Sequence, residues 1–205
     1  MKKGEKPTPS NAIPAFDMVA IAASAGGLSA ISAVLSNLPS TFPATIVIVQ
    51  HLDPRHRSLM AEILDRNTTL RVKQAEDGEK ILPSTVYIAP PDRHLLVNSD
   101  GTLALSQSEL VHFVRPSADL LFESVAASHK ERAIAVVLTG TGSDGSMGAQ
   151  AIKKMGGTVI CQSIESAEFT GMPLAVLQSK CVDFVLPLDE IAAALVTLVT
   201  KGESS

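Results

Sequence analysis

The chain has 205 residues, of which 45% are hydrophobic and 3% aromatic, which suffices for one sizeable core but hardly for two. Its 17 basic and 21 acidic residues give a formal charge of −4, so nothing in the composition favours binding to nucleic acid or to anionic lipid. No segment approaches the roughly 20 apolar residues that a membrane-spanning helix needs. The two cysteines, Cys161 and Cys181, lack the spacing of a metal site. We expect a soluble domain in a reducing cytoplasm.

Strand-like and helix-like segments alternate along the first half of the chain. Residues 1–16 are rich in Lys, Pro, Ser and Asn, and we expect a flexible tail or the stub of a linker. The pattern then predicts a strand at 18–22, a helix from about 28 to 35, a strand at 45–49, and a helix through Leu59, Ile63 and Leu64. This order is βαβα.

The second half continues the alternation after an inserted antiparallel element. The pattern predicts a strand at 86–89 and a hairpin at 94–106 around the turn Asn98-Ser99-Asp100-Gly101. A helix is predicted to start at Pro116, with Ser117 as its N-cap and with Leu120, Leu121 and Val125 facing inward. The remaining predicted elements are a strand at 133–138, a helix near 147–155, a strand at 158–161, a last strand at 182–186 and a last helix at 189–199. The predicted class is α/β: three α/β/α layers around a mostly parallel, doubly wound sheet with an inserted β-hairpin.

Three of the apolar strands are each followed by a residue type that a hydrolytic triad needs. Ser24 follows the strand at 18–22, His51 follows the strand at 45–49, and Asp144 comes shortly after the strand at 133–138. In an open parallel sheet the carboxyl ends of the strands share one edge, so these three residues can meet there. A nucleophile, a base and an orienting acid would then lie together.

The segment Ala22-Ala23-Ser24-Ala25-Gly26-Gly27 is close to a nucleophile elbow. Small residues allow the sharp turn from strand to helix, and the helix N-terminal amides lie near any oxyanion formed on the serine. Two other interpretations stay open. Ser24 could simply cap the next helix, or the glycines could cradle a phosphate, although neither G-x-G-x-x-G nor a P-loop lysine is present.

His51 is the best candidate for the base, because it comes directly after an apolar strand. Its neighbourhood, His51-Leu52-Asp53-Pro54-Arg55-His56, could also be considered as a metal cluster, but it matches no standard zinc spacing. Asp144 lies in Ser143-Asp144-Gly145, and the same tripeptide occurs in the hairpin turn at 99–101. The tripeptide alone therefore indicates a turn, and its place between a buried strand and a helix makes Asp144 the candidate acid.

The order Ser, His, Asp differs from that of the α/β-hydrolases and from those of chymotrypsin and subtilisin. Over roughly residues 17–198 the chain resembles the catalytic domain of chemotaxis receptor methylesterases of the CheB type. The matching motifs are Ala23-Ser24-Ala25-Gly26-Gly27, Gln50-His51, Ala75-Glu76-Asp77-Gly78-Glu79, Tyr87-Ile88-Ala89-Pro90-Pro91, Arg115-Pro116-Ser117, Leu138-Thr139-Gly140, Ser143-Asp144-Gly145 and Gly171-Met172-Pro173. Residues 199–205 are left as a C-terminal tail.

The resemblance implies a role for each candidate residue. Ser24 would be the nucleophile, His51 the general base and acid, and Asp144 the residue that orients His51. Backbone amides of Ala25, Gly26 and Thr141 would receive the oxyanion. Such an enzyme hydrolyses glutamate methyl esters on chemoreceptor signalling helices, in some members deamidates receptor glutamines, and needs no metal or redox cofactor.

The chain also departs from the family pattern in several places. This chain has Ala22 where the family usually has glycine, and Ala25 where it frequently has threonine. It has Thr141 where methionine is common, and Val114 where histidine is frequent. Many members carry an N-terminal receiver domain, and this sequence looks like a receiverless member, for which a separate regulatory or methyltransferase protein would be a partner. A non-catalytic scaffold module and a serine esterase for small molecules remain as alternative functions.

Overall fold

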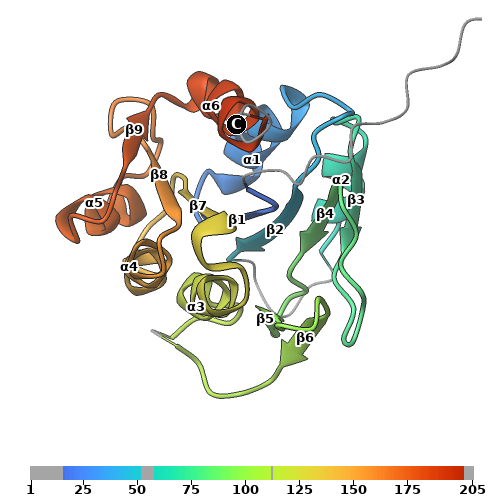
Figure 1. The fold of residues 1–205 in the computed structure, drawn as a ribbon. Coiled ribbons are helices and arrows are strands. Elements are labelled where there is room, and N and C mark those ends of the chain that lie inside the picture. Colours follow the sequence, from blue (N-terminus) through green and yellow to red (C-terminus); the bar gives the residue numbers. More distant parts are fainter. Residues whose placement is uncertain (1–15, 52–57, 112, 201–205) are drawn as a thin grey trace, which may run out of the picture.

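The computed structural model describes residues 16–51, 58–111 and 113–200 (Figure 1). Its centre is a seven-stranded sheet in which every neighbouring pair of strands is parallel. In spatial order the strands are β3 (Arg71–Gln74), β4 (Thr85–Ile88), β2 (Thr45–Gln50), β1 (Met18–Ala23), β7 (Ala133–Val137), β8 (Thr158–Gln162) and β9 (Phe184–Leu186). The predicted α/β class with a parallel sheet is confirmed.

Helices cover both faces of the sheet, which completes the three predicted layers (Figure 1). One face carries α1 (Gly27–Ser36), α2 (Met60–Asp65) and α6 (Leu188–Thr200), and the other carries α3 (Ala118–His129), α4 (Ser146–Lys154) and α5 (Gly171–Gln178). A short 3-10 helix, Lys130–Arg132, leads from α3 into β7. Because the central strands are buried on both faces, their sequences are continuous apolar runs rather than alternating patterns.

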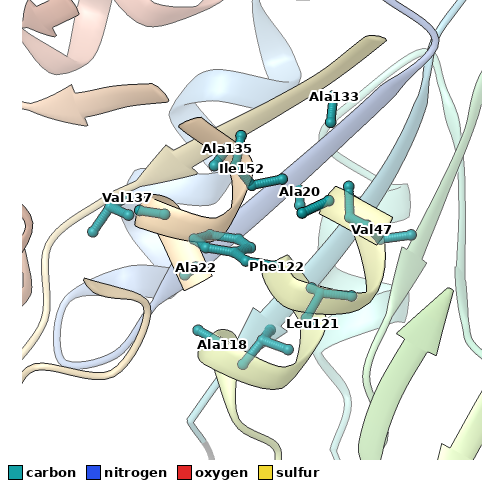
Figure 2. Packing of buried hydrophobic residues seen from close by; sticks show 14 of the residues in the cluster. Ala20, Ala22, Val47, Ala118, Leu121, Phe122, Ala133, Ala135, Val137 and Ile152 are labelled. Atoms are coloured by element: carbon teal, nitrogen blue, oxygen red, sulfur yellow. The ribbon is translucent and has the colours of Figure 1, made fainter. Parts of the chain in front are cut away.

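The face under α3 and α4 is built from small side chains on the sheet and larger ones on the helices (Figure 2). Ala20 and Ala22 of β1 leave space that Phe122 of α3 and Ile152 of α4 fill. Gly148 of α4 lets the two helices approach, since a Cβ atom there would lie 2.5 Å from Cβ of Phe122. The N-termini of α3 and α4 are therefore held beside the carboxyl ends of β1 and β7.

The inserted hairpin is also present. β5 (His94–Val97) and β6 (Leu103–Ser106) pair antiparallel in a sheet of their own. In the connecting turn, Asp100 accepts a hydrogen bond from the backbone N–H of Thr102 at 3.0 Å. The hairpin packs beside α3, because Leu95 and Val97 belong to the same core as Phe122.

Some elements differ from the prediction. The edge strand β3 and the helix α5 were not predicted. The last strand was expected at 182–186, but β9 starts at Phe184 and forms an exposed edge of the sheet. Leu120, expected to face inward, is only half-buried, whereas Leu121 and Val125 are buried as predicted.

The two ends of the chain extend beyond the described residues. Residues 1–15 of the expected N-terminal tail lie outside them. The helix α6 continues to Thr200, so residues 199 and 200, which were expected to belong to the C-terminal tail, are part of this helix. Residues 201–205 again lie outside the described part. Of the helices that the structure describes, none has both the length and the apolar character required to cross a bilayer.

The sheet order creates a crevice at one edge. β1 has β2 on one side and β7 on the other. The chain first adds β2, β3 and β4 on one side of β1 and later adds β7, β8 and β9 on the opposite side. Loops that follow these three strands meet above their carboxyl ends, where doubly wound folds bind their ligands.

Candidate active site

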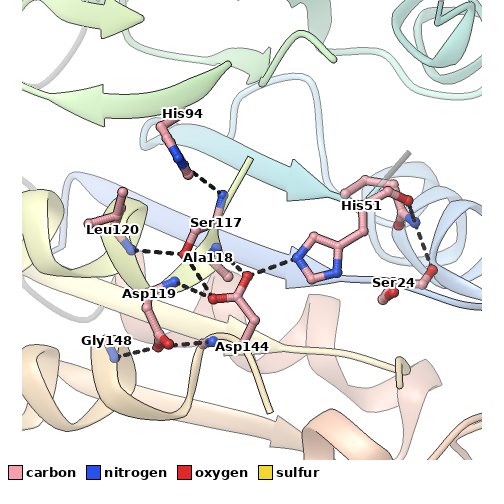
Figure 3. A network of polar contacts seen from close by, with 11 residues as sticks. Ser24, His51, His94, Ser117, Ala118, Asp119, Leu120, Asp144 and Gly148 are labelled. Atoms are coloured by element: carbon pink, nitrogen blue, oxygen red, sulfur yellow. Dashed lines mark hydrogen bonds and ion pairs between the residues drawn. The ribbon is translucent and has the colours of Figure 1, made fainter. Parts of the chain in front are cut away.

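The three predicted triad residues lie together in the crevice above β1, β2 and β7 (Figure 3). They line one pocket of about 330 Å³, together with Val114, Thr141, Gly142 and Ser143. Ser24 is half-buried, and the side chains of His51 and Asp144 are 14% and 4% exposed. The topology therefore brings together residues that are up to 120 positions apart in the sequence.

His51 is paired directly with Asp144. Its Nε2 atom lies 2.8 Å from Oδ2 of Asp144, and its other ring nitrogen, Nδ1, lies on the side of Ser24 (Figure 3). With Nε2 carrying the proton toward the carboxylate, Nδ1 is left as the acceptor. The Oγ atom of Ser24 has no hydrogen-bond partner within the described residues, so its hydroxyl is free to turn toward Nδ1.

Asp144 is held in place by the N-terminus of α3. Its carboxylate accepts hydrogen bonds from Oγ of Ser117 at 2.9 Å, from the backbone N–H of Ala118 at 2.6 Å and from that of Asp119 at 3.0 Å (Figure 3). Burial raises the pKa of the Asp144 carboxyl, but the hydrogen bonds from His51 and from these two amides outweigh it and hold the pKa below its ordinary value. Asp144 is thus a carboxylate that faces His51 in a fixed orientation.

Ser117 is in turn fixed by a histidine from the inserted hairpin. His94 is fully buried, and its Nδ1 accepts the backbone N–H of Ser117 at 3.1 Å. Its Nε2 lies 3.1 Å from the carbonyl oxygen of Glu109, which can only accept, so Nε2 carries the proton and the ring is neutral. The hairpin therefore reaches the triad through His94 and Ser117. The sequence predicted Ser117 as a helix cap but gave no signal for His94.

A second buried carboxylate joins α3 to the loop of Asp144. Oδ1 of Asp119 accepts the backbone N–H of Gly145 at 2.9 Å and that of Gly148 at 2.8 Å. Asp144 therefore accepts hydrogen bonds from the first turn of α3, to which Asp119 belongs, and Asp119 accepts them from the start of α4, which follows Asp144. Sequence reasoning did not find the role of Asp119.

The turn that carries Ser24 is locked by Gln50. Nε2 of Gln50 donates to the carbonyl oxygens of Ser24 at 2.7 Å and of His51 at 3.1 Å, which ties the loops after β1 and β2 together. Oε1 of Gln50 occupies the space that a side chain at Gly27 would need. Gln50 appeared in the sequence only as part of a motif, and the structure gives it this bridging position.

Backbone amides near Ser24 are free to receive an anion. The N–H groups of Ala25, Gly26 and Thr141 have no acceptor in the part of the chain that the structure describes. Gly26 adopts a left-handed conformation with φ of 74°, which a residue with a side chain rarely takes. Thr141 lines the pocket of Ser24, and Ala25 and Gly26 directly follow Ser24 in the loop after β1.

The loop of Thr141 is fixed by the start of α5. Gly140 donates its N–H to the carbonyl of Phe169 at 2.9 Å and accepts the N–H of Met172 at 2.9 Å. A Cβ atom at Gly171 would lie 2.8 Å from the backbone nitrogen of Gly142 and 3.1 Å from Cα of Thr141. The Gly171-Met172-Pro173 motif thus packs directly against this loop, and Gly171 leaves room for it.

The metal cluster considered at residues 51–56 lies outside the described residues except for His51. Within the residues that are described, no group of three or more His, Cys, Asp or Glu side chains is arranged to hold a metal ion. Cys161 and Cys181 are buried free thiols, and burial raises the pKa of Cys161 to about 12. Neither cysteine borders the pocket of Ser24.

Comparisons with known proteins identify the family of the chain. A family model described as CheB methylesterase matches residues 19–195. The crystal structure of the Thermotoga maritima CheB methylesterase catalytic domain is similar with a TM-score of 0.87 at 41% identity, and the match covers 90% of this chain and 99% of that one.

Relatives of two lengths match the chain. One from Thermotoga maritima, named protein-glutamate methylesterase/protein-glutamine glutaminase, is 41% identical over 185 residues, which cover 89% of this chain but 54% of the relative. Another relative, from Leptospira interrogans, is 39% identical over 183 residues, and the match covers 95% of that relative. The chain therefore spans about half of the longer relative and nearly all of the shorter one. On the family match and these identities, the chain belongs to the CheB methylesterase family.

Proposed function

We propose that the chain is a protein-glutamate methylesterase that hydrolyses glutamate methyl esters on the cytoplasmic signalling helices of chemoreceptors and releases methanol. One observation carries the proposal: Ser24 shares a pocket with His51, and His51 is paired with the buried Asp144 at 2.8 Å. The names of the family and of the relatives support the same reaction. The location of the substrate makes this a cytoplasmic activity.

The proposed reaction begins with attack on the ester. Nδ1 of His51 accepts the hydroxyl proton of Ser24 while Oγ bonds to the ester carbonyl carbon. The carbonyl oxygen gains the negative charge, and the amides of Ala25, Gly26 and Thr141 are the donors available to stabilise it. Asp144 keeps the ring of His51 oriented and stabilises the imidazolium that forms.

The second half returns the enzyme to its starting state. The imidazolium of His51 gives its proton to the departing methoxide, which leaves as methanol, and Ser24 is left acylated by the glutamyl group. Water then loses a proton to His51 and attacks the acyl carbon, and Oγ of Ser24 recovers the proton when it departs. A glutamine side chain would follow the same course with ammonia as the leaving group, which is the deamidation named for the relatives.

Methanol release from a methylated chemoreceptor cytoplasmic fragment tests the proposal. We expect the intact chain to release methanol and Ser24→Ala to release none above background, because the substitution removes the proposed nucleophile from the pocket. Release that persists in Ser24→Ala would rule out the serine mechanism. Hydrolysis of small esters without any release from the fragment would favour a small-molecule esterase, and no hydrolysis of either would favour a scaffold role.

A further inference from the structure

A turn next to the pocket presents an aromatic side chain to solvent. Phe113 is 95% exposed, more than any other large hydrophobic residue that the structure describes. Its backbone has φ of 66°, in the left-handed region where bulky residues are uncommon. The turn therefore keeps a phenyl ring outside the core at a position where Gly or Asn would fit the backbone better.

Hydrogen bonds hold the residues on both sides of Phe113. Val111 and Val114 exchange backbone hydrogen bonds of 3.2 and 2.9 Å across it. The next residue, Arg115, donates from Nε and Nη2 to Asp92 at 2.9 and 2.6 Å, and from Nη1 to the carbonyl of Ser108 at 2.7 Å. Phe113 thus projects from between residues that are held by hydrogen bonds.

The exposed ring is carried by the residue that precedes Val114 of the catalytic pocket. Val114 lines that pocket together with Ser24 and His51, and consecutive Cα atoms are only about 3.8 Å apart, so the backbone of Phe113 adjoins the pocket wall. A second exposed apolar side chain, Met147 at 57% exposure, follows Asp144 by three positions in the first turn of α4. Both apolar side chains therefore belong to segments that form the pocket.

We propose that Phe113 is a docking residue for the substrate helix and contacts an apolar side chain about one helical turn from the methylated glutamate. This inference rests on the proposed function. A glutamyl ester side chain is short, so the helix that carries it must come to the rim of the pocket when the ester reaches Ser24. Residues three or four positions away lie about 5–6 Å along the same face of that helix and meet the same rim.

The position of the ring identifies this occupant. A second copy of the chain bound at Phe113 would sit next to Val114 of the pocket and would compete with the approaching substrate helix. The substrate is the one partner whose docking at this rim serves the reaction. A rigid aromatic anchor beside the reacting group is typical of residues that dominate binding energy at interfaces.

Kinetics on two substrates test the docking role. Asn adopts the left-handed conformation readily, so Phe113→Asn keeps the turn while it removes the ring. We expect this variant to raise KM for a methylated receptor fragment about tenfold and to leave kcat within about twofold. Its kcat/KM on N-acetylglutamate γ-methyl ester amide should be unchanged. Phe184→Asn is the matched control, because Phe184 is an exposed phenylalanine, 42% accessible, on the far edge strand β9.

Further variants identify what Phe113 contacts. Phe113→Leu should restore most of the affinity for the fragment, because it keeps an apolar side chain. A serine placed on the fragment one turn from the methylated glutamate should weaken turnover by the intact chain but have little further effect on Phe113→Asn, since contacting residues are non-additive.

Each contrary outcome has a distinct meaning. An unchanged KM for the fragment in Phe113→Asn overturns the docking role while the proposed function stands. Equal losses on both substrates also overturn it, because the ring would then support the pocket itself. A change from dimer to monomer without a change in KM would assign Phe113 to self-association. An intact chain that releases no methanol from the fragment overturns both the proposed function and the docking role.

Discussion

Asp144 and Asp119 hold each other's loops in place. The carboxylate of Asp144 accepts the backbone N–H of Asp119 at 3.0 Å, and the carboxylate of Asp119 accepts the backbone N–H of Gly145 at 2.9 Å. Both carboxylates are buried at the N-terminus of a helix, where the helix dipole favours negative charge. The residue that orients His51 is therefore also part of the packing of α3 against α4.

Asp144→Asn should lose both activity and stability. Asn keeps only one of the two oxygens, so its NH₂ group faces either the amide of Ala118 or that of Asp119 without accepting its hydrogen bond. The neutral side chain also cannot stabilise a protonated His51. We expect kcat to fall by roughly 10³–10⁴-fold and the free energy of unfolding to fall by about 2 kcal/mol. Methanol release and urea titration measure the two quantities. If Asp144→Asn unfolds at the same urea concentration as the intact chain, the hydrogen bonds to the start of α3 contribute nothing to stability.

The low pKa of Asp144 predicts how stability depends on pH. Burial alone would raise this pKa, but the hydrogen bonds from His51, Ala118 and Asp119 lower it below the value of an unfolded chain. The unfolded chain then binds a proton at a higher pH than the folded one. The stabilisation by Asp144 is therefore complete above about pH 4 and is lost as pH falls through the folded pKa. Urea midpoints from pH 2.5 to 6 should decline less steeply at the acid end in Asp144→Asn than in the intact chain. Parallel curves would contradict the prediction.

His94 should act as a positioning residue through Ser117. His94→Leu removes the acceptor for the backbone N–H of Ser117, and we expect kcat to fall by roughly 10- to 100-fold with KM unchanged. His94→Asn is the conservative variant, because its side-chain oxygen can take the place of Nδ1, and it should recover most of the lost kcat. If both variants lose the same activity in proportion to their stability, His94 has only a packing role.

Gly171→Ala should disturb the loop that carries Thr141. The added Cβ atom would lie 2.8 Å from the nitrogen of Gly142, so the loop after β7 must shift. We expect kcat to fall by roughly 10²-fold while the ester still binds, because the amide of Thr141 moves away from the developing oxyanion. Gly78→Ala is a control for lost stability alone, because its φ of 72° strains any side chain, while nothing lies within 4 Å of the added atom and Gly78 is not among the residues that line the pocket. Full activity in Gly171→Ala would exclude the loop from oxyanion binding.

The arrangement of Ser24, His51 and Asp144 could be predicted because it depends on topology alone. Parallel strands align their carboxyl ends, so residues that follow β1, β2 and β7 gather wherever these strands are neighbours in the sheet. Buried parallel strands are also the easiest elements to find, because both of their faces are apolar.

Other features depend on packing that leaves no local pattern. β3 is an edge strand with the sequence Arg71-Val72-Lys73-Gln74, in which exposure permits polar residues and hides the strand signal. α5 begins with Gly171-Met172-Pro173, which is typical of a loop. His94 and Ser117 are 23 residues apart and meet only because the hairpin packs against α3. Single-sequence reasoning cannot anticipate such a contact.

The shared caps of Asp119 and Asp144 bear on how catalysis can disappear during evolution. Substitution of Asp144 would remove a cap from α3 as well as the partner of His51, so selection for a folded protein preserves it even after turnover has become dispensable. Ser24 has no such structural duty for its hydroxyl among the described residues. Descendants of this fold that have become pure binding modules should therefore have lost the serine while they keep the aspartate, and the serine is the position that reports whether a homologue still turns over substrate.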